Sequence, residues 1–143
     1  QSADLARVDF AGYIEALAGH LVASYRVAGP RVALDVRVAD VRLPIDAAVP
    51  CGLLINELLS NSLKHAFPGR DAGRITVELS AADGAAELVV ADDGVGLPPA
   101  AAADPPATYG LRLVAALVDQ LHGRLAVADG PGACYRVTFP LAP

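Results

Sequence analysis

The sequence predicts an α+β domain built as a two-layer sandwich, in which helices cover one face of a mixed, mainly antiparallel sheet. Two observations favour this fold class. Apolar residues recur at helical spacing in three separate segments, and the segments between them alternate apolar with polar residues, as half-buried strands do. The expected order is helix, strand, helix, two strands, loop, helix and two strands, which indicates helices packed on one sheet.

The first half of the chain is expected to hold two helices and at least one strand. A helix runs from about Asp9 to Val27 and a strand over Val32–Val38, whereas Val41–Leu43 is either a short edge strand or a loop. The second helix ends at Phe67. Pro50 is tolerable only in the first turn of that helix or just before it.

The second half is expected to be rich in strands. A first hairpin joins Arg74–Ala81 to Ala86–Ala91, and a mobile loop follows over Pro99–Ala107. A helix over Gly110–His122 then leads to a final hairpin, which joins Arg124–Ala128 to Ala133–Phe139.

Composition and charge are those of one globular domain. The 143 residues are 54% hydrophobic and carry a net charge of −5, which argues against general nucleic-acid binding because that requires a basic face. No apolar run approaches the roughly 20 residues needed to span a bilayer, and the N-terminus has no signal-peptide pattern. We therefore expect a cytoplasmic domain without membrane contact. Cys51 and Cys134 lack metal-ligand spacing and are expected to be reduced thiols, although the sequence alone does not exclude a disulfide between them.

The second helix carries the most informative pattern. At about 100° per residue, Glu57, Asn61 and Lys64 fall within roughly 60° of one another, with His65 beside them, while the opposite side is apolar. A solvated outer face is the simplest interpretation. However, Lys64 is the only lysine in the chain, and Asn61 offers an amide oxygen suited to Mg²⁺. We interpret this stripe as a site.

Two glycine-containing segments supply further candidates. Asp92 ends a predicted strand and is followed by Gly94 and Gly96. Glycine permits positive φ and a close approach of the backbone to a ligand, and a carboxylate can accept a hydrogen bond from an exocyclic amine such as that of adenine. Taken alone this pattern is weak, because many hairpin ends share it.

The second glycine segment opens the last helix. The free N–H groups after Gly110 can meet a phosphate, and Arg112 adds positive charge. The alternative is a simple helix cap. Between the two glycine segments, the loop from about Leu97 to Tyr109 is expected to fold over a bound nucleotide as a lid.

In this order, the three motifs resemble the Bergerat-type ATP-binding fold shared by sensor histidine kinases, MutL-type repair proteins, gyrase and heat-shock chaperone ATPases. Asn56–His65 is similar to the N box of this superfamily, Asp92–Gly96 to its first glycine box and Gly110–Val114 to its second. The likeness is greatest to the catalytic domains of bacterial histidine kinases of the HWE class and its sister class, and it covers roughly Val8–Pro140.

The resemblance implies ATP and Mg²⁺ as cofactors. Asn61 would coordinate Mg²⁺, and Glu57 aligns with the carboxylate that activates water in hydrolysing relatives; in a kinase it could polarise or deprotonate the accepting imidazole. Asp92 would accept from the adenine amine. The remaining nucleotide-binding positions implied are Lys64, His65, Gly94, Gly96, Gly110, Leu111 and Arg112.

The activity implied is transfer of the ATP γ-phosphoryl group to a histidine on a separate dimerisation domain, with a response regulator downstream. Residues 1–8 would be a linker from that missing domain and residues 9–143 the catalytic domain. The phosphoaccepting helix pattern is absent from the sequence, so this chain alone is not expected to phosphorylate itself.

Some residues depart from the family patterns. The chain has no tryptophan, so the sister class fits better than the HWE class; Ala133 stands where many relatives have threonine, and Arg112 where other histidine kinases often have glycine. Two other functions stay open: a Ser/Thr kinase of the anti-sigma type with the same fold, and a nucleotide-free phosphotransfer adaptor.

Overall fold

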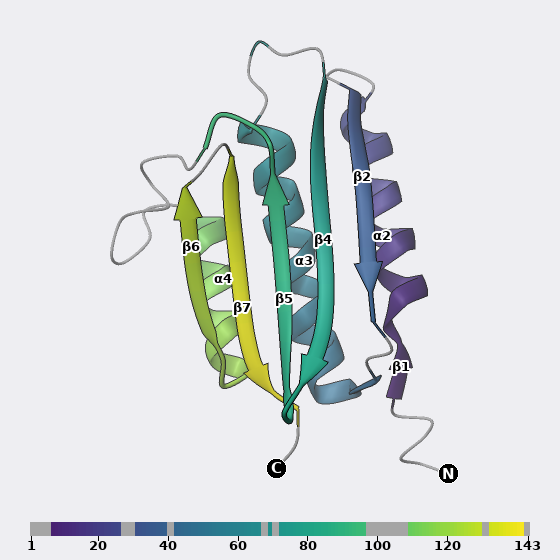
Figure 1. Ribbon diagram of the computed structural model, residues 1–143, viewed down its shortest axis with the longest axis vertical. Coiled ribbons are helices and arrows are strands. Elements are labelled where there is room, and N and C mark those ends of the chain that lie inside the picture. The colour runs from purple at the N-terminus through teal and green to yellow at the C-terminus, as the bar shows by residue number, and fades with distance from the viewer. Residues whose placement is uncertain are drawn as a thin grey trace.

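The helices of the described chain lie on one face of a five-stranded sheet (Figure 1). The structure, a computed structural model, describes residues 7–26, 31–39, 42–66, 69, 72–96, 109–129 and 132–141. Within these residues the helices are α2 (Phe10–Arg26), α3 (Ile45–His65) and α4 (Tyr109–Gln120), with α3 between the other two in Figure 1. The predicted two-layer α+β architecture is confirmed. No helix among the described residues is long and apolar enough to cross a membrane.

The main sheet has the strand order β2-β4-β5-β7-β6. Its strands are β2 (Arg31–Val38), β4 (Ala72–Ala82), β5 (Ala85–Asp92), β6 (Arg124–Asp129) and β7 (Ala133–Pro140). β2 pairs with β4 in parallel and the other neighbours are antiparallel, which confirms a mixed, mainly antiparallel sheet. Asp83 and Gly84, at φ 54° and 77°, form the tight turn between β4 and β5, a conformation that suits a two-residue hairpin.

A second, two-stranded sheet was not predicted in full. β1 (Arg7–Asp9) pairs antiparallel with β3 (Arg42–Pro44), so the segment that the sequence left as strand or loop is a short strand.

Pro50 lies inside α3, and the expectation that it precedes the helix or occupies its first turn is wrong. The helix begins at Ile45, so Pro50 falls in its second turn. A proline there leaves the carbonyl of Asp46 without its helical partner, and Asp46 is an exposed residue near the helix end, where water can satisfy that carbonyl.

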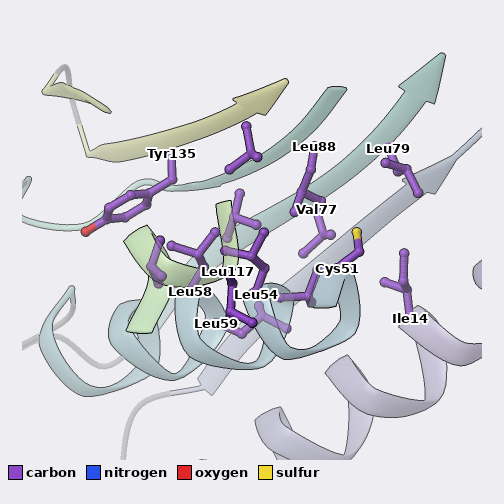
Figure 2. Packing of buried hydrophobic residues seen from close by; sticks show 14 of the residues in the cluster. Ile14, Cys51, Leu54, Leu58, Leu59, Val77, Leu79, Leu88, Leu117 and Tyr135 are labelled. Carbon is purple, nitrogen blue, oxygen red and sulfur yellow. The ribbon is translucent and has the colours of Figure 1, made fainter. Parts of the chain in front are cut away.

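The core forms where α3 meets the inner face of the sheet. Figure 2 shows Leu54 and Leu58 of α3 directed toward side chains of the strands. β4, β5 and β7 alternate buried and more exposed residues along their length, as strands with one covered face do. Each fully buried leucine stabilises the fold by about 1.5–3 kcal/mol relative to an exposed one, so the core fixes the orientation of α3 on the sheet.

Both cysteines are free thiols, as expected. Cys51 is fully buried on α3, and burial raises the pKa of its thiol to about 12. Cys134 on β7 is only partly buried.

Candidate nucleotide-binding site

Four chain segments meet at one end of the domain. The C-terminal end of α3, the end of β5, the beginning of β7 and the beginning of α4 all lie at the upper end of the molecule in Figure 1. Two hydrogen bonds to Asp92 tie β5 to α3 and to β7 at this end. Candidates separated by about fifty residues in the sequence are therefore brought together.

Asp92, the last residue of β5, is held by three hydrogen bonds. Its Oδ2 accepts from the Ser62 hydroxyl at 3.0 Å, and its Oδ1 accepts from the backbone N–H of Gly94 at 2.9 Å and of Ala133 at 3.2 Å. The donors come from α3, the glycine segment and β7. This carboxylate is consequently fixed in position by the protein itself, as a group that reads a ligand must be.

The first glycine segment packs against the end of α3. The N–H of Val95 donates to the carbonyl of Ala66 at 2.8 Å, and a Cβ at Gly94 would collide with that same carbonyl oxygen. Gly94 is therefore required by close packing of one backbone on another. Gly96, at φ 98°, occupies a conformation that side-chain-bearing residues rarely adopt.

Three residues around Asp92 were not identified from the sequence. Ser62 is the only buried polar or charged side chain among the described residues, and its position on the apolar side of α3 concealed its role. Gly132 lies against Asp92, because a Cβ there would collide with the Asp92 carbonyl oxygen. The pKa of Tyr135 is raised by burial and, secondly, by the charge of Asp92.

The predicted stripe on α3 points away from the core, as expected. Glu57 and Asn61 are half-buried and Lys64 is exposed, whereas Leu58, Leu59 and Leu63 between them are buried. The Nδ2 atom of Asn61 is buried and has no hydrogen-bond partner in the described part of the chain. The side chain of His65 lies outside the described residues.

The second glycine segment begins α4. Gly110 is the second residue of the helix, which agrees with the prediction, and Leu111 is buried while Arg112 is exposed. Most of the expected lid, residues 97–108, lies outside the described residues.

These side chains have the chemistry that a nucleotide with Mg²⁺ needs. A buried amide nitrogen without an acceptor costs about 1–3 kcal/mol, and a ligand oxygen that accepts from Nδ2 of Asn61 would remove that cost. No group of three or more His, Cys, Asp or Glu in the described chain could hold a metal alone. Mg²⁺ commonly binds through one or two protein oxygens together with substrate phosphates, and the amide oxygen of Asn61 is the one that would serve here.

Comparison with known proteins places the chain in a family. Residues 47–143 match the family described as "Histidine kinase-, DNA gyrase B-, and HSP90-like ATPase", to which the chain belongs. Among its relatives, Blue-light-activated histidine kinase 2 of Erythrobacter litoralis is 32% identical over 113 residues, covering 78% of this chain and 33% of the relative. Sensor histidine kinase PdtaS of Mycobacterium tuberculosis is 34% identical over 96 residues, covering 65% of this chain and 19% of the relative.

A solved structure of a histidine kinase has the same fold as this chain. The Erythrobacter litoralis EL346 blue-light activated histidine kinase superposes with a TM-score of 0.83 at 28% identity, over 92% of this chain and 41% of that one. The chain thus has the fold of the histidine kinase ATPase domain. It spans a third or less of the length of the curated relatives named above.

Proposed function

We propose that this domain transfers the γ-phosphoryl group of Mg²⁺-bound ATP to a histidine on a separate dimerisation domain, as the catalytic part of a two-component sensor kinase. The observation that carries this proposal is the convergence of Asp92, the Glu57–Asn61 stripe and the start of α4 at one end of the fold. In this scheme residues 1–8 lead to the phosphoacceptor domain, a response regulator receives the phosphoryl group, and the domain works in the cytoplasm.

The proposed site divides into a base end and a phosphate end. Asp92 accepts from the adenine amine, because Oδ2 has one donor and retains a second lone pair. Asn61 would hold Mg²⁺, and Lys64, His65 and Arg112 are the residues proposed to bind the phosphates. Gly94, Gly96, Gly110 and Leu111 shape the backbone around the nucleotide.

The proposed reaction is an in-line displacement. A lone pair of the imidazole nitrogen attacks the γ-phosphorus, the bond from that phosphorus to the β,γ-bridging oxygen breaks, and ADP leaves with the electron pair. Glu57 accepts a hydrogen bond from the N–H of the imidazole, or takes its proton. Either interaction stabilises the positive charge that develops on the ring. When bound, Mg²⁺ would neutralise charge on the phosphates.

The test is the chemical stability of the product. The domain is incubated with a supplied phosphoacceptor domain, with ATP labelled at the γ-phosphate and with Mg²⁺. The acceptor should acquire a label that acid removes and base does not, because phosphohistidine is acid-labile. An acid-stable label would instead identify a serine or threonine acceptor, and bound ATP without any protein label would indicate that the domain is not a kinase.

A further inference from the structure

Tyr135 of β7 is a buried tyrosine whose hydroxyl has no role in the reaction proposed above. The residue is 3% exposed, and none of the hydrogen bonds among the described residues involves its hydroxyl. The oxygen is nevertheless not sealed inside the protein, because the one fully buried, unpaired side-chain nitrogen or oxygen of the described chain is Nδ2 of Asn61. Polar groups of buried residues are normally hydrogen-bonded, so this hydroxyl is free to meet a ligand.

The register of the sheet places Tyr135 on the same face as Asp92. β5 and β7 are antiparallel neighbours, with Val90 directly opposite Tyr135. Side chains alternate between the two faces of a strand, so Asp92, two residues beyond Val90, is the diagonal neighbour of Tyr135. Diagonal neighbours on one face lie about 7–8 Å apart, within reach of an aromatic side chain. This face is the one that the helices cover, because Asp92 accepts from Ser62 of α3.

The ring of Tyr135 points toward the nucleotide end of the domain. Figure 2 shows its hydroxyl oxygen on the side where β7 begins, away from Leu88 and Leu79. β7 begins beside the end of β5, since the N–H of Ala133 donates to Oδ1 of Asp92. The charge of Asp92 raises the pKa of Tyr135, after the larger effect of burial. This electrostatic effect agrees with a hydroxyl that lies near the carboxylate.

The other donors around Asp92 are already engaged. The hydroxyl of Ser62 donates to Oδ2, and the N–H groups of Gly94 and Ala133 donate to Oδ1. The side chain of Ala133 itself has no polar atom. Among the described residues around Asp92, the Tyr135 hydroxyl is therefore the donor that remains for a ligand.

Adenine needs such a donor next to the acceptor that binds its amine. The exocyclic amine donates, and N1, the ring nitrogen beside it, accepts a hydrogen bond; enzymes commonly read a base along this edge. A phenol donates only while it is protonated, and both burial and the charge of Asp92 keep Tyr135 protonated at neutral pH. Guanine has an oxygen in place of the amine and an N–H in place of N1, so it presents the opposite pair.

We propose that the Tyr135 hydroxyl is a second base-reading group, which donates a hydrogen bond to N1 of adenine while Asp92 accepts from the amine. This inference rests on the proposed function and adds a specificity-determining residue to it. Asp92 and Tyr135, on neighbouring strands, form an acceptor and donor pair that is complementary to adenine.

The test compares wild type with Tyr135→Phe in calorimetric titrations with ATP and two analogues, all with Mg²⁺. Phenylalanine keeps the ring and removes only the oxygen, so Tm should not fall. Affinity for ATP should fall roughly two- to tenfold, the contribution of one neutral hydrogen bond. 7-deaza-ATP retains N1 and should show the same ratio between the two proteins. 1-deaza-ATP has C–H in place of N1 and should bind both proteins equally.

Tyr13→Phe is the matched control, because it removes the hydroxyl of an exposed tyrosine on α2. This variant should bind ATP as wild type does. An equal loss of affinity in Tyr13→Phe and Tyr135→Phe would mean that the effect is not specific to the base end, and would contradict the proposal.

The outcomes separate this inference from the proposed function. If wild type binds ATP and Tyr135→Phe binds it equally well, Tyr135 does not read the base and the proposed function stands. If Tyr135→Phe weakens 1-deaza-ATP as much as ATP, the hydroxyl does not contact N1. If only 7-deaza-ATP is insensitive to the substitution, the contact is to N7 and the assignment to N1 is wrong. If wild type binds no ATP, both the inference and the proposed function fail.

Discussion

The two ends of the proposed site differ in how completely the protein satisfies its own polar groups. At the base end, Asp92 receives three hydrogen bonds from donors on different segments. At the phosphate end, the buried Nδ2 of Asn61 has no partner among the described residues. The base end is therefore built by the fold, whereas the phosphate end is to be completed by its ligand. Substitutions should then affect stability and binding together at Asp92, and binding alone at Asn61.

The largest effect is expected at Asn61. Asn61→Ala should abolish both the Mg²⁺-dependent part of ATP binding and phosphoryl transfer, because the proposed metal-coordinating oxygen is lost. Since the buried unpaired amide disappears as well, Tm should not fall. Calorimetry with and without Mg²⁺, together with thermal unfolding, measures both quantities. A variant that keeps its Mg²⁺ dependence, or that loses stability as Asp92→Asn does, would break the contrast between the two ends.

Asp92→Asn should show the opposite combination. The substitution replaces a charged acceptor by an amide, so ATP affinity should fall by about 1.5–3 kcal/mol, and preference for ATP over GTP should weaken. Tm should also fall, because the amide oxygen is a weaker acceptor than a carboxylate for the N–H groups of Gly94 and Ala133, and an amide nitrogen in the place of Oδ2 cannot accept from the Ser62 hydroxyl. Equal ATP affinity in variant and wild type would show that Asp92 does not read the base.

Glu57→Gln should separate binding from catalysis. Glu57 cannot attract an anionic phosphate, so nucleotide affinity should stay near that of wild type. The transfer rate should fall by at most about 10²-fold, the low end for a general base, because neutral histidine already has a lone pair. Parallel measurements of affinity and of transfer in the intact kinase check this. A loss of ATP affinity as large as that of Asn61→Ala would assign Glu57 to the wrong role.

Ser62→Ala tests one of the three contacts to Asp92. Loss of the hydroxyl should cost about 1.5–3 kcal/mol of unfolding free energy, as expected for a hydrogen bond to a charged group, and should weaken ATP binding less than Asp92→Asn does. Ser60→Ala on the same helix is the matched control, because Ser60 is less buried. If the two variants bind ATP equally and unfold at the same temperature, the Ser62 hydroxyl does not position Asp92.

The smallest effect concerns Tyr135, whose pKa is raised by burial and by the charge of Asp92. A raised pKa keeps the phenol protonated to higher pH. Asp92→Asn removes the second cause, so the pKa of Tyr135 should fall toward its ordinary value in an ultraviolet titration of tyrosinate. Tyr135→Phe identifies which titration step belongs to this residue. An unchanged step in Asp92→Asn would mean that the two side chains do not interact.

The sequence was sufficient where local chemistry determines the structure. The period of α3 gave its buried and exposed sides, and the Asp-Gly turn gave the β4–β5 hairpin. Strand β1 could not be predicted in the same way, because its three residues are too few to establish an alternating pattern and they pair with β3, more than thirty residues away.

The candidate site was predictable only in part, and for a related reason. Asp92 and Asn61 have side chains whose chemistry suggests a ligand. The importance of Ser62 and Gly132 depends on contacts with Asp92 across the fold, and their side chains alone do not reveal it. Ser62 looks like a small residue on an apolar face, and Gly132 looks like an ordinary turn glycine.

The central claim is that the end of the domain where α3, β5 and α4 meet binds ATP with Mg²⁺. Isothermal titration of the wild-type chain with ATP, once with Mg²⁺ and once with a chelator, tests it most directly. We predict saturable binding of one nucleotide per chain that is stronger with Mg²⁺. Absence of saturable binding under both conditions, or binding of equal strength with and without Mg²⁺, would contradict the account.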